Sequence, residues 1–399
     1  MSGILKAFKN VFIWDPREKG LLGILRCAML FNFLFLLQQF GLNPYYFIFL
    51  QVIVACLFIK YCKFSMWSKQ CFYHRLILSL LFIWSLFIIF NCNYDLYWFV
   101  HLCFKPYGYI CILLPFILVC YSNYADFKSL LDFCYETVKV SLVILILCFP
   151  LMSQNWGGND ELRGESMQLF EVINTYIDGA LLFVVLFVNK FTQSQKKVIY
   201  LTLLFSLFCS AYFGRRGVLI SCILALVLSI LITLVDSKVK HKFQYMLSII
   251  LIFTLGYYFI FHVGISYFEY ILGRIDDDTR SGVNLNVIEQ IVNSDKFYIG
   301  RGFEGTYYND YYGDRDGIET GYLQLILKGG LIYSILMSLY FIPAIFLGIF
   351  KTNNSDIRAC ALYILLFVIV FNIASSNLSF SIRYIPAVIC ANMIYRKHF

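Results

Sequence analysis

Residues 320–350 read TGYLQLILKGGLIYSILMSLYFIPAIFLGIF, and Lys328 is the only charged residue among these 31. A helix of that length measures about 46 Å, whereas the hydrocarbon core of a bilayer is about 30 Å thick. The segment is therefore apolar enough to cross a membrane and longer than one crossing requires. The Lys328-Gly329-Gly330 triplet predicts a kink or break, so that the first half lines a cavity and does not face lipid.

Similar apolar runs fill the rest of the chain. Of its 399 residues, 60% are hydrophobic and 14% are charged, against about 45–50% and about 25% in a typical soluble domain. This composition excludes an ordinary soluble enzyme, a disordered protein and a DNA-binding module. Twelve runs have spanning length, and they lack the alternation of barrel strands, so we expect an all-α polytopic membrane protein. They lie near 20–40, 44–61, 74–91, 98–120, 137–152, 171–189, 197–213, 217–235, 246–263, 320–350, 358–376 and 378–395.

The basic residues predict the orientation of these spans. Of the 32 Lys and Arg, 20 fall on the side of the N-terminus and 8 on the opposite side when the spans alternate. Cytoplasmic loops are enriched in Lys and Arg, so both termini are expected in the cytoplasm. The chain then forms a single polytopic domain, 1–399, with a large external loop at 264–319 between spans nine and ten. That loop contains eleven acidic and five basic residues.

Gly214-Arg215-Arg216-Gly217 joins two spans on the external side, where basic residues are unusual. Arginine offers a planar, permanently charged fork that fits phosphate oxygens, and glycine allows the backbone to approach a ligand closely. These features favour an anion site. The alternative is that both arginines reach to the outer headgroups and anchor the helix ends.

The start of the long loop reads GRIDDDTRSG over 273–282. Arg274 and Arg280 flank three acids, Asp276 to Asp278, and either arginine could join the arginine pair at a shared anion. Carboxylates suit hard cations, but three adjacent residues point in different directions. A solvated acidic turn is the alternative interpretation, and no metal is expected.

The end of the loop contains a predicted tight turn, Gly300-Arg301-Gly302-Phe303, followed by Glu319 where the chain re-enters the membrane. A carboxylate at a helix N-terminus could be a general base or a helix cap. Arg383, near the outer end of the last span, could reach the same cavity. Arg26 is expected to pair internally or to reach the headgroups, because charge within a span is costly.

Four motifs occur in this order: GRRGVL (214–219), GRIDDDTRSG (273–282), IGRGF (299–303) and ETGYLQLILKGGLI (319–332). Together they resemble the O-antigen polymerase and ligase superfamily of bacterial inner membranes. The resemblance covers about 205–350 and implies a GT-C-like fold. The related ligases have histidine at the position of Glu319, so this chain looks like the polymerase (Wzy) branch. Arg215 replaces the serine usual in the family, which aligns Arg216 with the family arginine.

The resemblance implies glycosyl transfer at the periplasmic face, from a polyprenyl-diphosphate-linked glycan to a lipid-linked repeat unit, for lipopolysaccharide or another surface polysaccharide. It implies undecaprenyl-diphosphate-linked donor and acceptor, membrane lipid, and a polysaccharide chain-length regulator as partners. No nucleic acid, cofactor or metal is expected, because the basic residues punctuate apolar runs and the external loop offers no convincing carboxylate cage. The implied catalytic residues are Glu319, Arg216 and Arg280. The implied diphosphate- or substrate-binding residues are Arg215, Arg274, Arg301, Tyr322 and Arg383. The aromatic residues Tyr307, Tyr308, Tyr311 and Tyr312 suit sugar stacking or shielding from solvent. An O-antigen ligase and a lipid-linked oligosaccharide flippase are the alternatives.

Overall fold

The computed structural model describes residues 2–13, 20–39, 64–91, 109–121, 123–156, 170, 173, 179–213, 216–235, 243, 247, 250, 254, 279–303, 305–309, 313–315, 318, 320–371 and 383–398. The α-helices within these ranges are α1 (Ser2–Phe12), α2 (Gly20–Gln39), α4 (Phe72–Phe90), α6 (Tyr109–Ile117), α7 (Tyr124–Trp156), α9 (Gln193–Tyr212), α10 (Arg216–Val235), α13 (Thr279–Val292), α14 (Gly321–Phe350), α15 (Ser355–Leu366) and α17 (Tyr384–His398). Short helical turns are η1 (Phe64–Lys69), η2 (Leu118–Cys120), η3 (Val188–Lys190) and the π-helical η4 (Phe367–Phe371).

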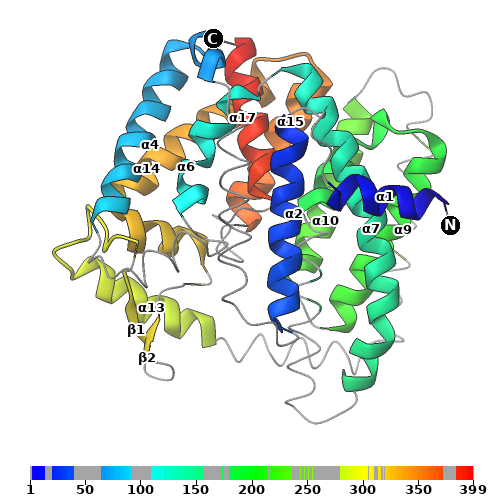
Figure 1. Ribbon diagram of the computed structural model, residues 1–399, viewed down its shortest axis with the longest axis horizontal. Coiled ribbons are helices and arrows are strands. Elements are labelled where there is room, and N and C mark those ends of the chain that lie inside the picture. The colour runs from blue at the N-terminus through cyan, green and yellow to red at the C-terminus, as the bar shows by residue number, and fades with distance from the viewer. Residues whose placement is uncertain are drawn as a thin grey trace.

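The long helices run side by side in one bundle (Figure 1). The described residues of 264–319, called the external segment after the side predicted for it, lie at one end of this bundle. α14 packs against α4, α15 and α17, while α7 packs against α1, α2 and α9. Contacts of α17 with α7 and of α10 with α15 join the two groups. The predicted all-α fold is confirmed for the described residues, apart from a small antiparallel hairpin of β1 (Tyr307–Asn309) and β2 (Gly313–Arg315).

Three of the described helices are long and apolar enough to cross a membrane: Phe72–Phe90, Tyr124–Ser153 and Gly321–Phe350. Shorter apolar helices span Gly20–Leu30 and Gly217–Ile232. The chain is therefore a membrane protein, as predicted. The expected spans at 44–61 and 246–263 lie largely outside the described residues, so the number twelve stays a prediction.

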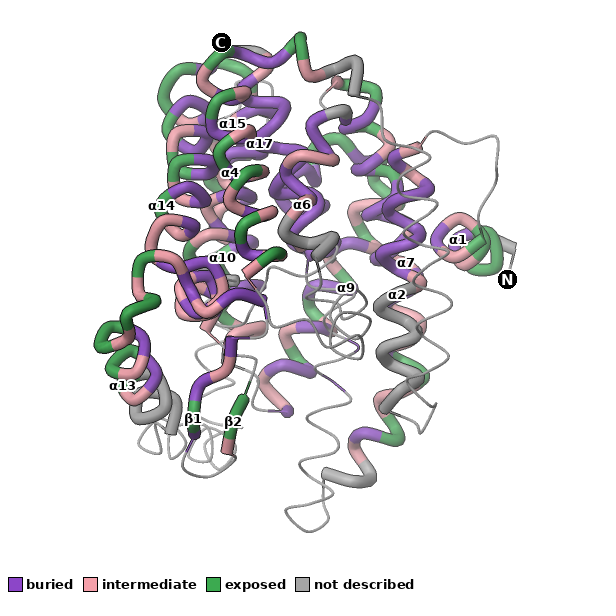
Figure 2. Tube along the Cα trace, turned by 60° about the vertical axis from the view of Figure 1, so that its left-hand side comes forward, coloured by how far each residue is buried: buried purple, intermediate pink, exposed green. Residues whose placement is uncertain are grey.

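Two of the spanning helices, α4 and α14, carry exposed residues, drawn green along the tube in Figure 2, and their large apolar members form stripes. The exposed residues of α4 are Phe72, Leu76, Leu80, Ile83, Phe87 and Phe90. Those of α14 are Ile335, Leu339, Ile342, Phe346 and Phe350. Steps of three and four residues place each set on one helix face. Uninterrupted apolar stripes of this length are unfavourable in water and suit contact with lipid.

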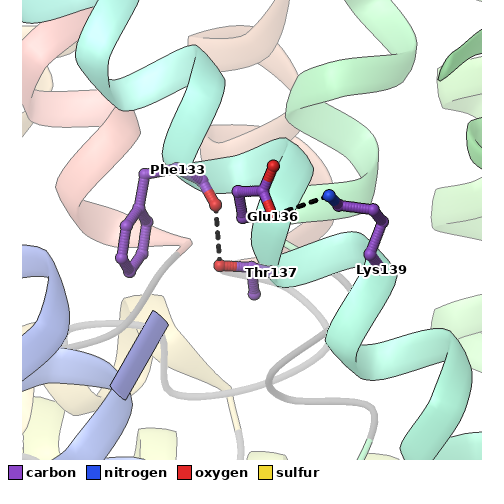
Figure 3. Close-up of polar contacts among 4 residues, drawn as sticks. All are labelled: Phe133, Glu136, Thr137 and Lys139. Carbon is purple, nitrogen blue, oxygen red and sulfur yellow. Dashed lines mark hydrogen bonds and ion pairs between the residues drawn. The ribbon is translucent and has the colours of Figure 1, made fainter. Parts of the chain in front are cut away.

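α7 corrects the span predicted at 137–152, because the helix already begins at Tyr124. Its first half is polar, and hydropathy therefore did not detect it. Within that half, Lys139 Nζ lies 2.7 Å from Glu136 Oε2, and the Thr137 hydroxyl donates to the Phe133 carbonyl at 2.9 Å (Figure 3). Both contacts stay within the helix, so Glu136, Lys139 and Thr137 find partners within one turn.

Candidate functional site

The external segment folds onto the first half of α14 through a small hydrophobic core of its own. This core joins α13, β1 and the first turns of α14. Its buried residues are Val287, Ile291, Tyr307, Ile318 and Leu327. The sequence predicted a long loop at 264–319, whereas the structure contains α13, β1 and β2 there. The first half of α14, residues 321–334, contains no exposed residue, in contrast to the exposed apolar stripe that begins at Ile335. This agrees with the expectation that this half does not face lipid, and its lining of a cavity stays a prediction.

The predicted break in α14 occurs at Gly330, whose backbone has φ 73° and ψ −179°. This conformation is open to glycine and strained for other residues. A Cβ at Gly330 would overlap the Tyr298 carbonyl, and a Cβ at Gly300 would overlap the Lys328 carbonyl. The two glycines therefore allow two backbone segments to touch where no side chain fits.

Residues 297–302, the docking turn, bond directly to the broken part of α14. The Arg301 N–H donates to the Leu327 carbonyl at 2.8 Å, and the Gly302 N–H donates to the Lys328 carbonyl at 3.1 Å. In return, the Leu331 and Ile332 N–H groups donate to the carbonyls of Phe297 and Tyr298 at 3.0 and 3.3 Å.

The Gly329 carbonyl accepts from the indole Nε1–H of Trp84 on α4, at 2.7 Å. Backbone groups freed by a broken helix must find protein partners when water is scarce. The docking turn and Trp84 provide those partners. The predicted tight turn at 300–303 is also confirmed, with positive φ at Gly300 and Gly302.

Two basic side chains hold the docking turn in shape. The Arg301 guanidinium donates to the Thr306 carbonyl at 2.6 Å and to the Gln290 carbonyl at 2.9 Å. The Lys328 ammonium donates to the carbonyls of Phe303 and Gly305, both at 2.8 Å. These contacts give Arg301 a role in the fold of the segment, and its predicted contact with substrate stays a prediction.

Two glutamines that were not among the predicted site residues hold the external segment together. The Gln290 amide donates to the Tyr308 carbonyl at 2.8 Å and accepts from the Tyr308 N–H at 3.0 Å, which joins α13 to β1. Gln324 Oε1 accepts from the Ile318 N–H at 2.7 Å, in the first turn of α14. A glutamine carries no charge or motif that would have revealed either role.

Glu319 itself lies outside the described residues, but both of its chain neighbours are anchored. Ile318 is buried and bonded to Gln324, and the Thr320 carbonyl accepts from the Gln324 N–H at 3.0 Å. Thr320 occupies the N-cap of α14, so Glu319 precedes the capping position by one residue. A side-chain cap normally comes from the N-cap residue, which weakens the capping interpretation of Glu319.

Two of the predicted arginines lie at helix N-termini. Arg216 is the first residue of α10 and Arg280 is the second residue of α13, so both stand in the first turn of a helix. Such turns expose backbone N–H groups that attract anions. The hydroxyl of Tyr322 donates to the Val368 carbonyl in η4. Arg215 and Arg274 lie outside the described residues.

Arg383 and Arg26 both lie where the helices meet. The Arg383 carbonyl accepts from the Tyr363 hydroxyl at 3.1 Å, just before α17 begins. Arg26 is buried in α2, and its Nε–H donates to the Asn10 carbonyl of α1 at 2.6 Å, which confirms the predicted internal pairing. Across the described ranges, no group of three His, Cys, Asp or Glu side chains is arranged to hold a metal ion. The acidic run at 276–278 lies outside them.

No family model matches the chain, and the searches of curated proteins and of solved structures gave no match.

Proposed function

We propose that the chain is a membrane glycosyltransferase that polymerises O-antigen or a related surface polysaccharide. In this proposal it lies in a bacterial inner membrane with about twelve spans, a GT-C-like fold and both termini in the cytoplasm. The excess of Lys and Arg on the N-terminal side supports that orientation.

One observation carries the proposal. The motif IGRGF (299–303) and the motif ETGYLQLILKGGLI (319–332) are separate in sequence, yet the docking turn and the break in α14 form one hydrogen-bonded unit. Two of the four motifs on which the resemblance depends therefore belong to a single structural unit. That unit lies beside the start of α14, where Thr320 follows Glu319.

The reaction transfers a glycan between two lipid carriers. An acceptor hydroxyl oxygen forms a bond to the anomeric carbon of the donor, and the bond from that carbon to the diphosphate oxygen breaks. The diphosphate leaves with the electron pair, and the hydroxyl proton passes to a base. Glu319 is the proposed base, because a sugar hydroxyl is a poor nucleophile until its proton is being removed.

The departing diphosphate gains negative charge, which fixed cations can stabilise. Arg216 and Arg280 are the proposed cations, with Arg215 and Arg274 beside them in sequence. The helix N-termini at Arg216 and Arg280 add backbone N–H groups of favourable polarity. This assignment uses no metal ion, so polymerisation by the purified protein is expected to survive EDTA. Activity lost in EDTA and restored by Mg²⁺ would instead favour the acidic run Asp276 to Asp278.

Electrophoresis of surface polysaccharide from a deletion strain tests the proposal. Loss of a polymerase leaves a single repeat unit on the lipid A-core, and a plasmid copy of the gene restores the ladder of long chains. Bare core with accumulated lipid-linked polymer would identify a ligase. Absence of both products from the outer face would identify a flippase, and an unchanged ladder would refute all three functions.

A further inference from the structure

α1 is an amphipathic helix with an apolar side wider than the surface that the protein covers. Ala7 and Val11 are 1% and 0% exposed, while Phe8 and Phe12 pack partly against the core. Leu5, in contrast, is 77% exposed. At about 100° per residue, Leu5 lies within about 20° of Phe12 around the helix axis, so the apolar side extends beyond the protein contact.

Beyond Leu5 the surface of α1 becomes basic, because Lys9 and Lys6 lie about 40° and 100° from Leu5 around the axis. Lys6 and Lys9 are exposed and lie about 60° apart around the axis. The sequence of α1, SGILKAFKNVF, contains no acidic residue. An exposed apolar edge that borders a basic side is the pattern of a helix lying in a membrane surface.

α1 also has the orientation that such a helix requires. It lies crosswise to α2 and α7 in both Figure 1 and Figure 2, and α7 and α14 supply membrane-spanning segments. The bond from Arg26 of α2 to the Asn10 carbonyl fixes the last turn of α1 to the bundle. A cation at this end is favoured by the helix dipole. α1 is therefore a fixed part of the fold and lies crosswise to the spans.

We infer that α1 lies in the membrane surface on the N-terminal side, with Leu5 among the acyl chains, and that Lys6 and Lys9 bind anionic phospholipid headgroups. The apolar edge could be buried in zwitterionic or anionic lipid alike. A preference for anionic lipid therefore depends on the two lysines. Each lysine near an anionic membrane surface adds to the electrostatic attraction between the helix and the lipid headgroups. The inference requires only that the chain resides in a membrane, and it does not depend on the proposed polysaccharide reaction.

The test uses the full-length protein in nanodiscs of phosphatidylcholine with 30% phosphatidylglycerol. A fluorescent amino acid replaces Leu5 in one sample and Lys6 in another, and lipids with a doxyl group on the acyl chain quench it. We expect strong quenching at position 5 and weak quenching at position 6, which lies about 100° away around the helix. Equal, weak quenching at both positions would overturn the in-plane placement, and would also be the result if a protein partner covered Leu5.

The headgroup preference is measured at position 5 with the two quenchers at equal mole fraction, doxyl-phosphatidylglycerol or doxyl-phosphatidylcholine. Enrichment of anionic lipid beside α1 makes the first quencher stronger. The double variant Lys6→Gln/Lys9→Gln should abolish the difference, which corresponds to a loss of up to about 30-fold in local preference. The matched control Lys196→Gln/Lys197→Gln, at the start of α9, should leave it unchanged. Equal quenching by both lipids in the unmodified protein would overturn the anionic preference.

Discussion

Arg216 and Arg280 are the residues on which stabilisation of the leaving group depends in the proposed reaction. Arg216→Ala and Arg280→Ala should each lower polymerisation by about 10²–10³-fold, the usual effect of removing one donor from a developing charge. Arg216→Lys should also be impaired, because an ammonium group cannot reproduce the bidentate fork of a guanidinium. Chain length on gels, with protein level measured by immunoblot, checks this prediction.

The matched control for the arginines is Arg315→Ala, since Arg315 is an exposed residue of β2 in the same external segment. It should leave chain length near normal. Long chains from Arg216→Ala at normal protein level would end the anion-site interpretation of the Gly-Arg-Arg-Gly turn.

Glu319→Gln separates a base from a helix cap. The amide still accepts hydrogen bonds but cannot take a proton at neutral pH, so a base variant should insert normally and lose about 10²–10⁴-fold in rate. Removing a cap would instead lower stability by about 0.5–2 kcal/mol and leave chain length unchanged. Glu289→Gln, at an exposed position of α13, is the control for loss of one carboxylate. Polymer of normal length from Glu319→Gln would remove the catalytic role and leave the family resemblance intact.

At the level of elements, the contact between the docking turn and α14 makes a prediction about glycine. Gly300→Ala and Gly330→Ala would each force a Cβ into a backbone carbonyl in addition to straining a positive φ. We expect a marked fall in the midpoint of thermal unfolding for the detergent-solubilised protein.

Gly313→Ala provides the control for that experiment. Gly313 has a similar φ of +69°, yet a Cβ there would meet nothing within 4 Å. It therefore carries only the strain of a left-handed conformation, about 1–2 kcal/mol. Equal thermal shifts for all three variants would show that the close approach of the two backbones contributes no stability of its own.

For the whole molecule, the orientation in the membrane is the prediction that most constrains the chemistry. Reporter fusions at Lys128 and Lys240 should report the cytoplasm, and fusions at Asp160 and Asp310 should report the periplasm, because Lys and Arg are retained on the cytoplasmic side. A cytoplasmic signal at Asp310 would place the external segment away from its substrates and would reject the proposed reaction.

Part of the site could be predicted from sequence because the signals are local. The break in α14 was indicated by Gly329 and Gly330 after Lys328. The tight turn before it was indicated by the glycines on both sides of Arg301. The pairing of these two features could not be predicted, because it depends on hydrogen bonds between residues 297–302 and 327–332. Arg301 and Lys328 were recognised as unusual charges, but their carbonyl partners became evident only in the folded segment.

The sequence by itself determined that the chain is helical and enters a membrane, and it located α4, α9, α10 and α14 to within a few residues. The reason is that an apolar helix satisfies its backbone within itself, so its signal is contained in consecutive residues. Tertiary structure decided the rest: the small core that orders α13 and the hairpin, the hydrogen bonds between the docking turn and α14, and the crosswise position of α1. These features depend on surfaces that meet only when distant segments pack together, and no run of neighbouring residues contains that information.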